Sequence, residues 1–185
     1  LGGFLSSFAY KKNFIAVLHG SELKAGGFLL QNLTKWSLGR FESLIAVSEF
    51  TKKCALEINP KLNIKVINNG IERVENFQKR LKTKRVNLVT VGNLTLRKGQ
   101  QNVIKALPFL KEKFSDIHYH CIGIPTKKAK FLEIAKSLNV SENITFYGAL
   151  SDSEKNRILI ESTIFVMLSE HINNDFEGFG IALLE

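Results

Sequence analysis

The chain has 185 residues, of which 44% are hydrophobic and 23% charged, and its formal net charge is +9. This composition is typical of a soluble globular protein, and no apolar run approaches the roughly 20 residues that span a bilayer. The positive charge favours an anionic partner, although a Lys-rich chain with solvated faces would have the same total. The basic residues are dispersed and not interleaved with aromatic residues, which argues against a nucleic-acid platform.

The cysteines and histidines show no metal or catalytic spacing. Cys54 and Cys121 lie far apart, which indicates buried core thiols and a reducing compartment such as the cytoplasm. His118, His120 and His171 have no Cys or carboxylate at ligand spacing, so we expect no metal site. The chain begins without a Met or a basic region, and we assign no signal peptide.

The first part of the chain alternates strands and helices. Short apolar runs with β-branched members predict strands at 13–18, 43–48 and 64–67. Helical patterns lie between them, one ending near residue 38 and one spanning 49–58. A strong turn signal, Asn68-Asn69-Gly70, ends this series.

Residues 71–85 are charged and have little apolar periodicity, which predicts a linker. The alternation then resumes, with strands at 86–92, 117–123, 143–148 and 163–168 and helices near 99–114, 127–138 and 152–162. Ser151 and Glu154 have the spacing of a capping box at the start of the last helix. Strands that alternate with helices of this length predict βαβ units and a parallel sheet, so the expected fold class is α/β.

The last nine residues carry the most specific pattern. Glu177 precedes the turn Gly178-Phe179-Gly180, and Glu185 follows after an apolar run. Glycine lets a ligand approach the backbone, and a helix start offers unpaired N–H groups to an anion. A carboxylate on each side of such a cradle suggests a sugar nucleotide. The plainer alternatives are a charge that favours the helix N-terminus at Glu177 and a helix-surface residue at Glu185.

A glycoside hydrolase pair is excluded by distance. Eight residues of helix from Glu177 to Glu185 span about 12 Å, whereas hydrolase carboxylates lie roughly 5–9.5 Å apart. No Gly-x-Ser-x-Gly elbow or Cys–His pairing indicates covalent catalysis.

A second candidate site is the loop between the strand at 86–92 and the helix that follows it. Gly92 and Gly99 bracket this loop, and Arg97 and Lys98 lie beside the helix N-terminus. Doubly wound sheets bind ligands at this end of their strands, where Arg and Lys can hold a phosphate. The loop matches neither the Walker pattern nor Gly-x-Gly-x-x-Gly, and solvated basic residues are the simpler alternative. His19 follows the first strand, and a structural role is its simpler alternative.

Several motifs, taken in order, resemble the family-4 glycosyltransferases of the GT-B fold. They are His19-Gly20-Ser21-Glu22, residues 45–52, residues 66–72, the loop from Gly92 to Gly99, and Glu177-Gly178-Phe179-Gly180 with Glu185. The resemblance covers nearly the whole chain and implies two Rossmann-like doubly wound domains. Residues 1–75 would be the end of an acceptor-side domain, 76–85 a linker, and 86–185 the start of a domain that binds the nucleotide-sugar donor. Both domains would be incomplete, so we expect this fragment to be inactive by itself.

The resemblance also implies roles for individual residues. Glu177 would hydrogen-bond the transferred sugar, the backbone of Gly178, Phe179 and Gly180 would meet the sugar and diphosphate, and Glu185 would hold the ribose. Lys98 would stabilise the departing diphosphate, and His19 would face the reacting sugar. Transfer would retain the anomeric configuration and need neither a metal nor another cofactor. The acceptor would be a glycan or lipid, as in the synthesis of cell-surface polysaccharide, lipopolysaccharide or glycolipid.

One position departs from the family pattern. Arg usually follows the glycine that ends the first donor-domain strand, and here that position is Asn93. Either Arg97 replaces the missing charge from the far end of the loop, or diphosphate binding is weaker. Two other functions stay open, a nucleotide-sugar epimerase of related fold and a non-catalytic sugar-nucleotide-binding module. The basic charge also suggests a peripheral position on an anionic membrane.

Overall fold

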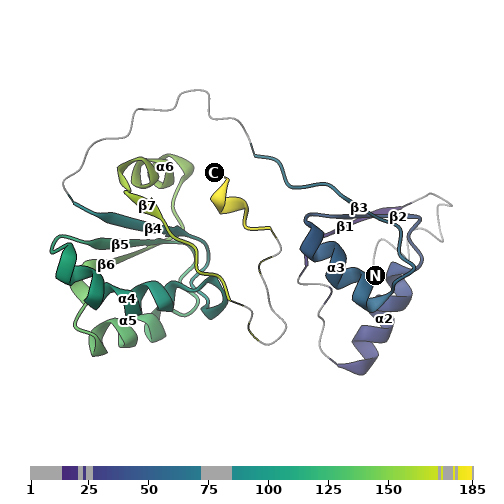
Figure 1. The fold of residues 1–185 in the computed structure, drawn as a ribbon, viewed down its shortest axis with the longest axis horizontal. Helices are drawn as coiled ribbons and strands as arrows, with labels where there is room; N and C mark the ends of the chain where they lie inside the picture. Colours follow the sequence, from purple (N-terminus) through teal and green to yellow (C-terminus); the bar gives the residue numbers. More distant parts are fainter. Residues whose placement is uncertain are drawn as a thin grey trace. The chain divides into compact units, whose positions relative to one another are not determined.

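The computed structural model describes residues 14–20, 23, 27–71, 85–170, 172, 177 and 179–184. Contacts divide the chain into two compact units, Leu1–Ile71 with Asn173–Ile181, and Glu72–Ile172 with Ala182–Glu185. Each unit has its own parallel sheet (Figure 1), so the α/β prediction is confirmed. The predicted linker at 76–85 lies outside the described residues except for Arg85, and the predicted domain limits stay a prediction. Within the described part of the chain, no helix is both long and apolar enough to cross a bilayer.

The first unit contains a sheet of three parallel strands in the order β1-β2-β3. Its elements are β1 (Ile15–Leu18), α2 (Phe28–Leu38), β2 (Ser43–Ala46), α3 (Glu49–Ile58) and β3 (Ile64–Val66). Helix α3 begins where predicted because the Ser48 hydroxyl accepts a hydrogen bond from the Thr51 N–H at 3.0 Å. The core of the unit includes Leu18, Leu44 and Ala55, all buried between sheet and helices.

The second unit is a doubly wound sheet of four parallel strands in the order β6-β5-β4-β7. Its strands are β4 (Asn87–Val91), β5 (His118–Ile122), β6 (Ile144–Gly148) and β7 (Ile164–Phe165), and its helices are η2 (Leu96–Lys98), α4 (Gln100–Lys113), α5 (Lys128–Ser137), η3 (Ser141–Asn143) and α6 (Asp152–Glu161). Helices α4 and α5 cover one face of the sheet, and α6 covers the other (Figure 1). The capping box predicted at Ser151 and Glu154 opens α6 and is confirmed.

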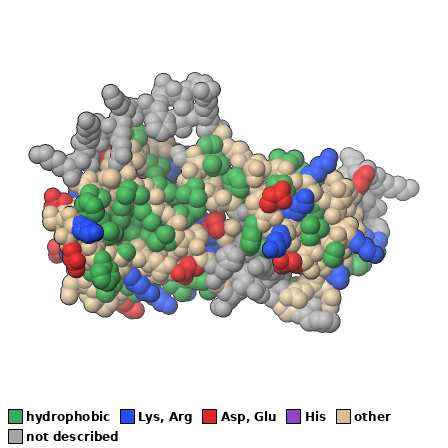
Figure 2. All heavy atoms as spheres, viewed as in Figure 1, with side chains coloured by type: hydrophobic (Ala, Val, Ile, Leu, Met, Phe, Trp, Pro, Cys, Tyr) green, Lys and Arg blue, Asp and Glu red, His purple; other side chains and the backbone are tan. Residues whose placement is uncertain are grey.

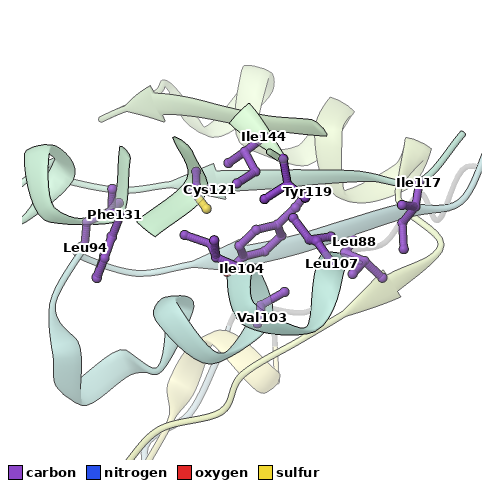
Figure 3. Close-up of a cluster of buried hydrophobic side chains, with 12 residues drawn as sticks. Leu88, Leu94, Val103, Ile104, Leu107, Ile117, Tyr119, Cys121, Phe131 and Ile144 are labelled. Atoms are coloured by element: carbon purple, nitrogen blue, oxygen red, sulfur yellow. The ribbon is translucent and has the colours of Figure 1, made fainter. Parts of the chain in front are cut away.

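The main core of the second unit lies between the sheet and helices α4 and α5 (Figure 3). Tyr119 projects from β5 into this core beside Ile104 and Leu107 of α4, and all three side chains are fully buried. Its hydroxyl lies 2.7 Å from the Thr90 hydroxyl. This bond satisfies a phenol that burial would otherwise leave without a partner.

The strand order places β4 at the point where the winding of the sheet reverses. From β4 the chain moves outward to β5 and β6, and it then returns to add β7 on the other side of β4. In open parallel sheets the crevice for a ligand forms at such a switch point, outside the carboxyl ends of the strands. The loops after β4 and β7 should therefore hold the site of this unit.

Among the described residues, the predicted strands and helices agree with the structure to within one or two residues, except at β7 and at the helix expected after the glycine turn. The sequence pattern predicts a strand at 163–168, but the ladder covers only Ile164–Phe165. The hydroxyl of Thr90 donates to the Val166 carbonyl at 2.6 Å. A side-chain bond to that carbonyl takes the place of a further ladder bond, and the chain leaves the sheet there.

Candidate functional site

Strands β4, β5 and β6 all reach their carboxyl ends at a glycine with positive φ. The φ angles are 149° at Gly92, 143° at Gly123 and 78° at Gly148, a region that side chains rarely adopt. At Gly123 a Cβ atom would lie 2.3 Å from the Gly92 carbonyl oxygen, so these two turns pack directly on each other. This edge of the sheet can therefore bring backbone groups close to a ligand.

The loop after β4 is fixed on the side of β5 by backbone hydrogen bonds. The Gly92 N–H donates to the Ile122 carbonyl at 2.8 Å, and the Leu94 N–H donates to the Ile124 carbonyl at 2.9 Å. The Lys127 N–H in turn donates to the Leu94 carbonyl at 3.0 Å. Leu94 itself is fully buried in the core, which anchors the middle of the loop.

The predicted phosphate-binding pair, Arg97 and Lys98, forms the short helix η2 at the end of this loop, and both are half-buried. The side chain of Lys98 lies across Gly92, where a Cβ atom would be 3.3 Å from the lysine Cε and 3.7 Å from its Nζ. The absence of a side chain at Gly92 leaves the lysine its place over the end of β4. Gly92 and Lys98, at opposite ends of the predicted loop, are thus neighbours at the switch point.

Asn93 is exposed and takes part in the turn rather than extending away from it. Its side-chain carbonyl accepts a long hydrogen bond of 3.4 Å from the Ile124 N–H. The Asn93 carbonyl and the Gly92 carbonyl both accept from the side-chain amide of Gln100, at 3.1 and 3.4 Å. Gln100 is almost completely buried beneath the loop.

The opposite side of the loop packs on the segment that follows β7. Gly99 has φ 75°, and a Cβ there would lie 1.8 Å from the Leu168 carbonyl oxygen. The Glu170 N–H donates to the Arg97 carbonyl at 2.7 Å. The Glu170 carboxylate accepts from Asn102 Nδ2 at 2.6 Å and from Gln101 Nε2 at 3.4 Å. Sequence reasoning missed Glu170 and the Gln-Gln-Asn run at the start of α4, and only the polar character of that run at a helix start could have pointed to it.

Several buried side-chain oxygens at this junction have no hydrogen-bond partner among the described residues. They belong to Thr95, Gln100, Gln101 and Ser169. Buried polar atoms without a partner are costly, so native proteins rarely leave them unpaired. Because these atoms lie together beside η2, the junction offers hydrogen-bonding atoms to a ligand or to water.

The remaining predicted residues belong to other parts of the chain. His19 directly follows β1 in the first unit and is exposed. Glu177 and Phe179 are half-buried, and Gly180 is buried with φ 72°, as a glycine turn requires. The helix expected after this turn is described as the short 3-10 helix η4 (Ile181–Leu183). Gly178 and Glu185 lie outside the described residues.

On one face of the molecule, charge is spread rather than concentrated. On the face shown in Figure 2, Lys and Arg side chains are scattered among acidic, hydrophobic and other side chains. Among the described residues no group of three or more His, Cys, Asp or Glu side chains could hold a metal ion. In the loop between β4 and α4, the basic residues are Arg97 and Lys98 of η2.

The chain matches one family of known proteins. The model of the family described as "Glycosyl transferases group 1" matches residues 72–185, which is more than half of the chain. No curated protein sequence matches.

Solved structures of similar fold include three glycosyltransferases. The lipopolysaccharide outer core galactosyltransferase WaaB has a TM-score of 0.67 and 16% identity, over 98% of this chain and 49% of that one. A mutant of TarM from S. aureus, in complex with fondaparinux, alpha-GlcNAc-glycerol and UDP, has a TM-score of 0.74 and 15% identity, over 99% of this chain and 37% of that one. WaaG, a glycosyltransferase involved in lipopolysaccharide biosynthesis, has a TM-score of 0.68 and 19% identity, over 87% of this chain and 49% of that one. The chain thus spans half or less of each structure, and the similarity at these identities concerns the GT-B fold.

Proposed function

The chain belongs to the glycosyl transferases group 1 family, and from this membership we propose that it is part of a retaining glycosyltransferase of the family-4 type. The proposed reaction moves a sugar from a nucleotide-sugar donor to a glycan or lipid-linked acceptor. The bond between the anomeric carbon and the diphosphate breaks, and the acceptor oxygen bonds to that carbon from the same face. The proton of the acceptor hydroxyl goes to the departing phosphate.

The observation that carries this proposal is the position of Lys98 over Gly92. The lysine lies at the carboxyl end of β4, at the switch point of a parallel sheet, next to a second cation at Arg97. Negative charge grows on the diphosphate as the sugar leaves, and fixed cations at that place lower the barrier. We assign the diphosphate to Lys98 and Arg97, with Gly92 and Asn93 contributing backbone.

The other predicted residues complete the proposed site. Glu177 binds the transferred sugar, the turn at Gly178, Phe179 and Gly180 meets sugar and diphosphate, and Glu185 binds the ribose. His19 faces the reacting sugar from the acceptor side. In this proposal Arg97 supplies the charge that Asn93 lacks, which agrees with the engagement of the Asn93 amide in its own turn.

The comparisons favour a role in polysaccharide or lipopolysaccharide synthesis. WaaB and WaaG are named for lipopolysaccharide, and TarM was solved with UDP and a glycan. We therefore propose UDP-sugars as the first donors to examine. No metal is required in the proposed reaction.

The test uses the complete protein that contains this chain, with transfer from UDP-glucose, UDP-galactose and UDP-GlcNAc to membrane glycolipid extract. Lys98→Met should lower kcat by about 10–100-fold, because a hydrogen bond to a charged group contributes about 1.5–3 kcal/mol. Lys105→Met, an exposed lysine on α4, is the matched control and should leave kcat unchanged. Arg97→Ala should raise the KM for the donor, and exposed Arg157→Ala on α6 serves as its control.

The same assays separate the alternatives. Epimerised nucleotide sugar formed without acceptor would indicate an epimerase, and donor binding without any product would indicate a binding module. Equal activities of Lys98→Met and the wild-type protein would refute the proposed site.

We also propose that the complete enzyme works in the cytoplasm, peripherally on the anionic face of a membrane, since the chain carries a net charge of +9. Basic residues near such a surface contribute about 1 kcal/mol each. Co-sedimentation with vesicles should increase with their phosphatidylglycerol content and decrease with salt. Binding that depends on neither would count against this proposal.

A further inference from the structure

Glu170 holds together the two loops that meet at the switch point of the second unit. Its backbone N–H donates to the Arg97 carbonyl at 2.7 Å, in the loop after β4. Glu170 itself lies in the segment after β7. One residue thus fixes the peptide that joins Arg97 to Lys98.

The carboxylate of Glu170 adds a second connection, to the first turn of α4. It accepts from Asn102 Nδ2 at 2.6 Å and from Gln101 Nε2 at 3.4 Å. Gln101 Nε2 also donates to the Leu96 carbonyl at 2.8 Å, at the start of η2. The carboxylate, the glutamine and η2 therefore form one hydrogen-bonded chain.

The Glu170 carboxylate is unexpected beside a loop that is proposed to bind a diphosphate. Negative charge close to Arg97 and Lys98 repels an anionic ligand, so it weakens the function proposed for this loop. A carboxylate offers two acceptor oxygens and no donor, however, and it faces two side-chain amides that each present N–H groups. These two bonds hold the carboxylate at the first turn of α4.

Resting on the proposed function, we propose that Glu170 is a positioning residue for diphosphate binding: through its backbone bond to Arg97 and through Gln101 it sets η2 so that Arg97 and Lys98 meet the diphosphate, while Asn102 holds its carboxylate in place. It does not touch the ligand. Its loss should reduce the affinity for the diphosphate part of the donor and leave binding of the nucleoside part unchanged.

The test exchanges the two partners of the shortest bond in the complete protein. Asn102→Asp places a second carboxylate against Glu170, and the repulsion should displace the loop. The double variant Glu170→Gln with Asn102→Asp restores one donor facing one acceptor, and the side-chain oxygen of the new amide can still accept from Gln101. Glu170→Gln alone is the control for charge, because it removes the negative charge near Arg97 and Lys98. Weaker UDP binding by this variant would report lost positioning of the loop, and tighter binding would report repulsion alone.

Dissociation constants for UDP and for uridine are measured by calorimetry on each variant. We expect Asn102→Asp to weaken UDP binding about tenfold, the double variant to return within about twofold of wild type, and uridine binding to stay constant throughout. A general loss of folding would weaken both ligands, and a melting curve of each variant records that loss separately.

The outcomes distinguish the two proposals. If the wild-type protein binds none of UDP, GDP and ADP, the proposed function fails and the inference with it. If wild type binds UDP but Asn102→Asp binds it equally well, or loses uridine and UDP in parallel, only the role of Glu170 is overturned. The role of Glu170 is also overturned if the double variant binds UDP as weakly as Asn102→Asp does while its melting temperature matches that of the wild type.

Discussion

At the scale of single residues, the geometry of the candidate site depends on glycines, whose lack of a side chain lets neighbouring groups approach the backbone. Gly92 leaves space for Lys98, and Gly99 lets η2 approach the segment after β7. Both have a positive φ, but the spatial demand differs from one glycine to another. Gly148 has φ 78°, close to the 75° of Gly99, yet a Cβ there would meet nothing within 4 Å. A comparison of substitutions at Gly99 and Gly148 can therefore distinguish the cost of the left-handed backbone, which both share, from the cost of a steric clash, which only Gly99 has.

Gly99→Ala should destabilise the protein more than Gly148→Ala. The left-handed backbone costs an alanine about 1–2 kcal/mol at either position. At Gly99 the new methyl group would also lie 1.8 Å from the Leu168 carbonyl oxygen, and the forced displacement should add about 1–3 kcal/mol. Urea denaturation of the two variants measures the difference, and equal losses would mean that the close approach at Gly99 does not constrain the fold.

The sequence allowed Arg97, Lys98, Gly92 and Gly99 to be predicted because they lie in one short loop with a recognisable pattern. Glu170 could not be found in this way, since its partner Gln101 is 69 residues away. A lone glutamate after a strand has no local signature. Which distant amides it meets depends on the strand order, which brings the ends of β4 and β7 together.

At the scale of elements, β5 carries two histidines on the face opposite the main core. Arg85 Nη2 lies 2.9 Å from His118 Nδ1, and His118 Nε2 lies 2.8 Å from the Thr145 hydroxyl. The arginine can only donate, so Nδ1 accepts and the ring is neutral, with its proton on Nε2. Burial, and then the nearby His120 and Arg85, lower the pKa of His118 to about 4.

Acidification should therefore destabilise the second unit between about pH 6.5 and pH 4. In this window the unfolded chain protonates His118 and the folded chain does not, so unfolding takes up a proton and stability rises with pH. The pKa of His120 is lowered as well, chiefly by burial, and it adds in the same direction. Each unit of pKa shift corresponds to about 1.4 kcal/mol when fully expressed, and we expect a total loss of about 1–3 kcal/mol.

His118→Gln removes the titrating ring and keeps a neutral side chain on β5. The variant should show a flatter dependence of the melting temperature on pH between 6.5 and 4, even if it is less stable at pH 7. Glu133→Gln, on α5, gives a comparison in which the histidines are intact. A slope in His118→Gln as steep as that of wild type would show that other groups control the acid response.

The helices and most strands followed from apolar periodicity and capping residues, as at Ser48 and Ser151. The length of β7 did not. The Thr90 hydroxyl donates a hydrogen bond to the carbonyl of Val166, 76 residues away. The apolar pattern of a strand cannot reveal that a distant side chain will bond a carbonyl that could otherwise pair with the neighbouring strand. Local signals therefore define where elements begin, while tertiary hydrogen bonds decide how far a strand extends.

At the scale of the whole molecule, the hydrophobic clusters of the described residues each belong to one unit. Leu44, Ala46 and Ala55 pack in the first unit, and Leu88, Ile104 and Leu107 pack in the second. A unit that buries its own core carries its own favourable free energy of folding. We therefore expect the complete protein to unfold in separable transitions.

Leu107→Ala and Leu44→Ala test this expectation, because both leucines are almost fully buried, one in each core. Removing such a side chain costs about 2–5 kcal/mol. In scanning calorimetry Leu107→Ala should lower the transition of the second unit and leave the other in place, and Leu44→Ala should do the reverse. UDP should raise the transition that Leu107→Ala lowers more than it raises the other, because ligand binding stabilises the unit that holds the ligand. The two cations proposed for the diphosphate belong to the second unit, whereas the turn at 178–180 belongs to the first. If both variants instead shift one shared transition by the same amount, the two cores unfold as a single cooperative body, and the donor site would then be stabilised by both.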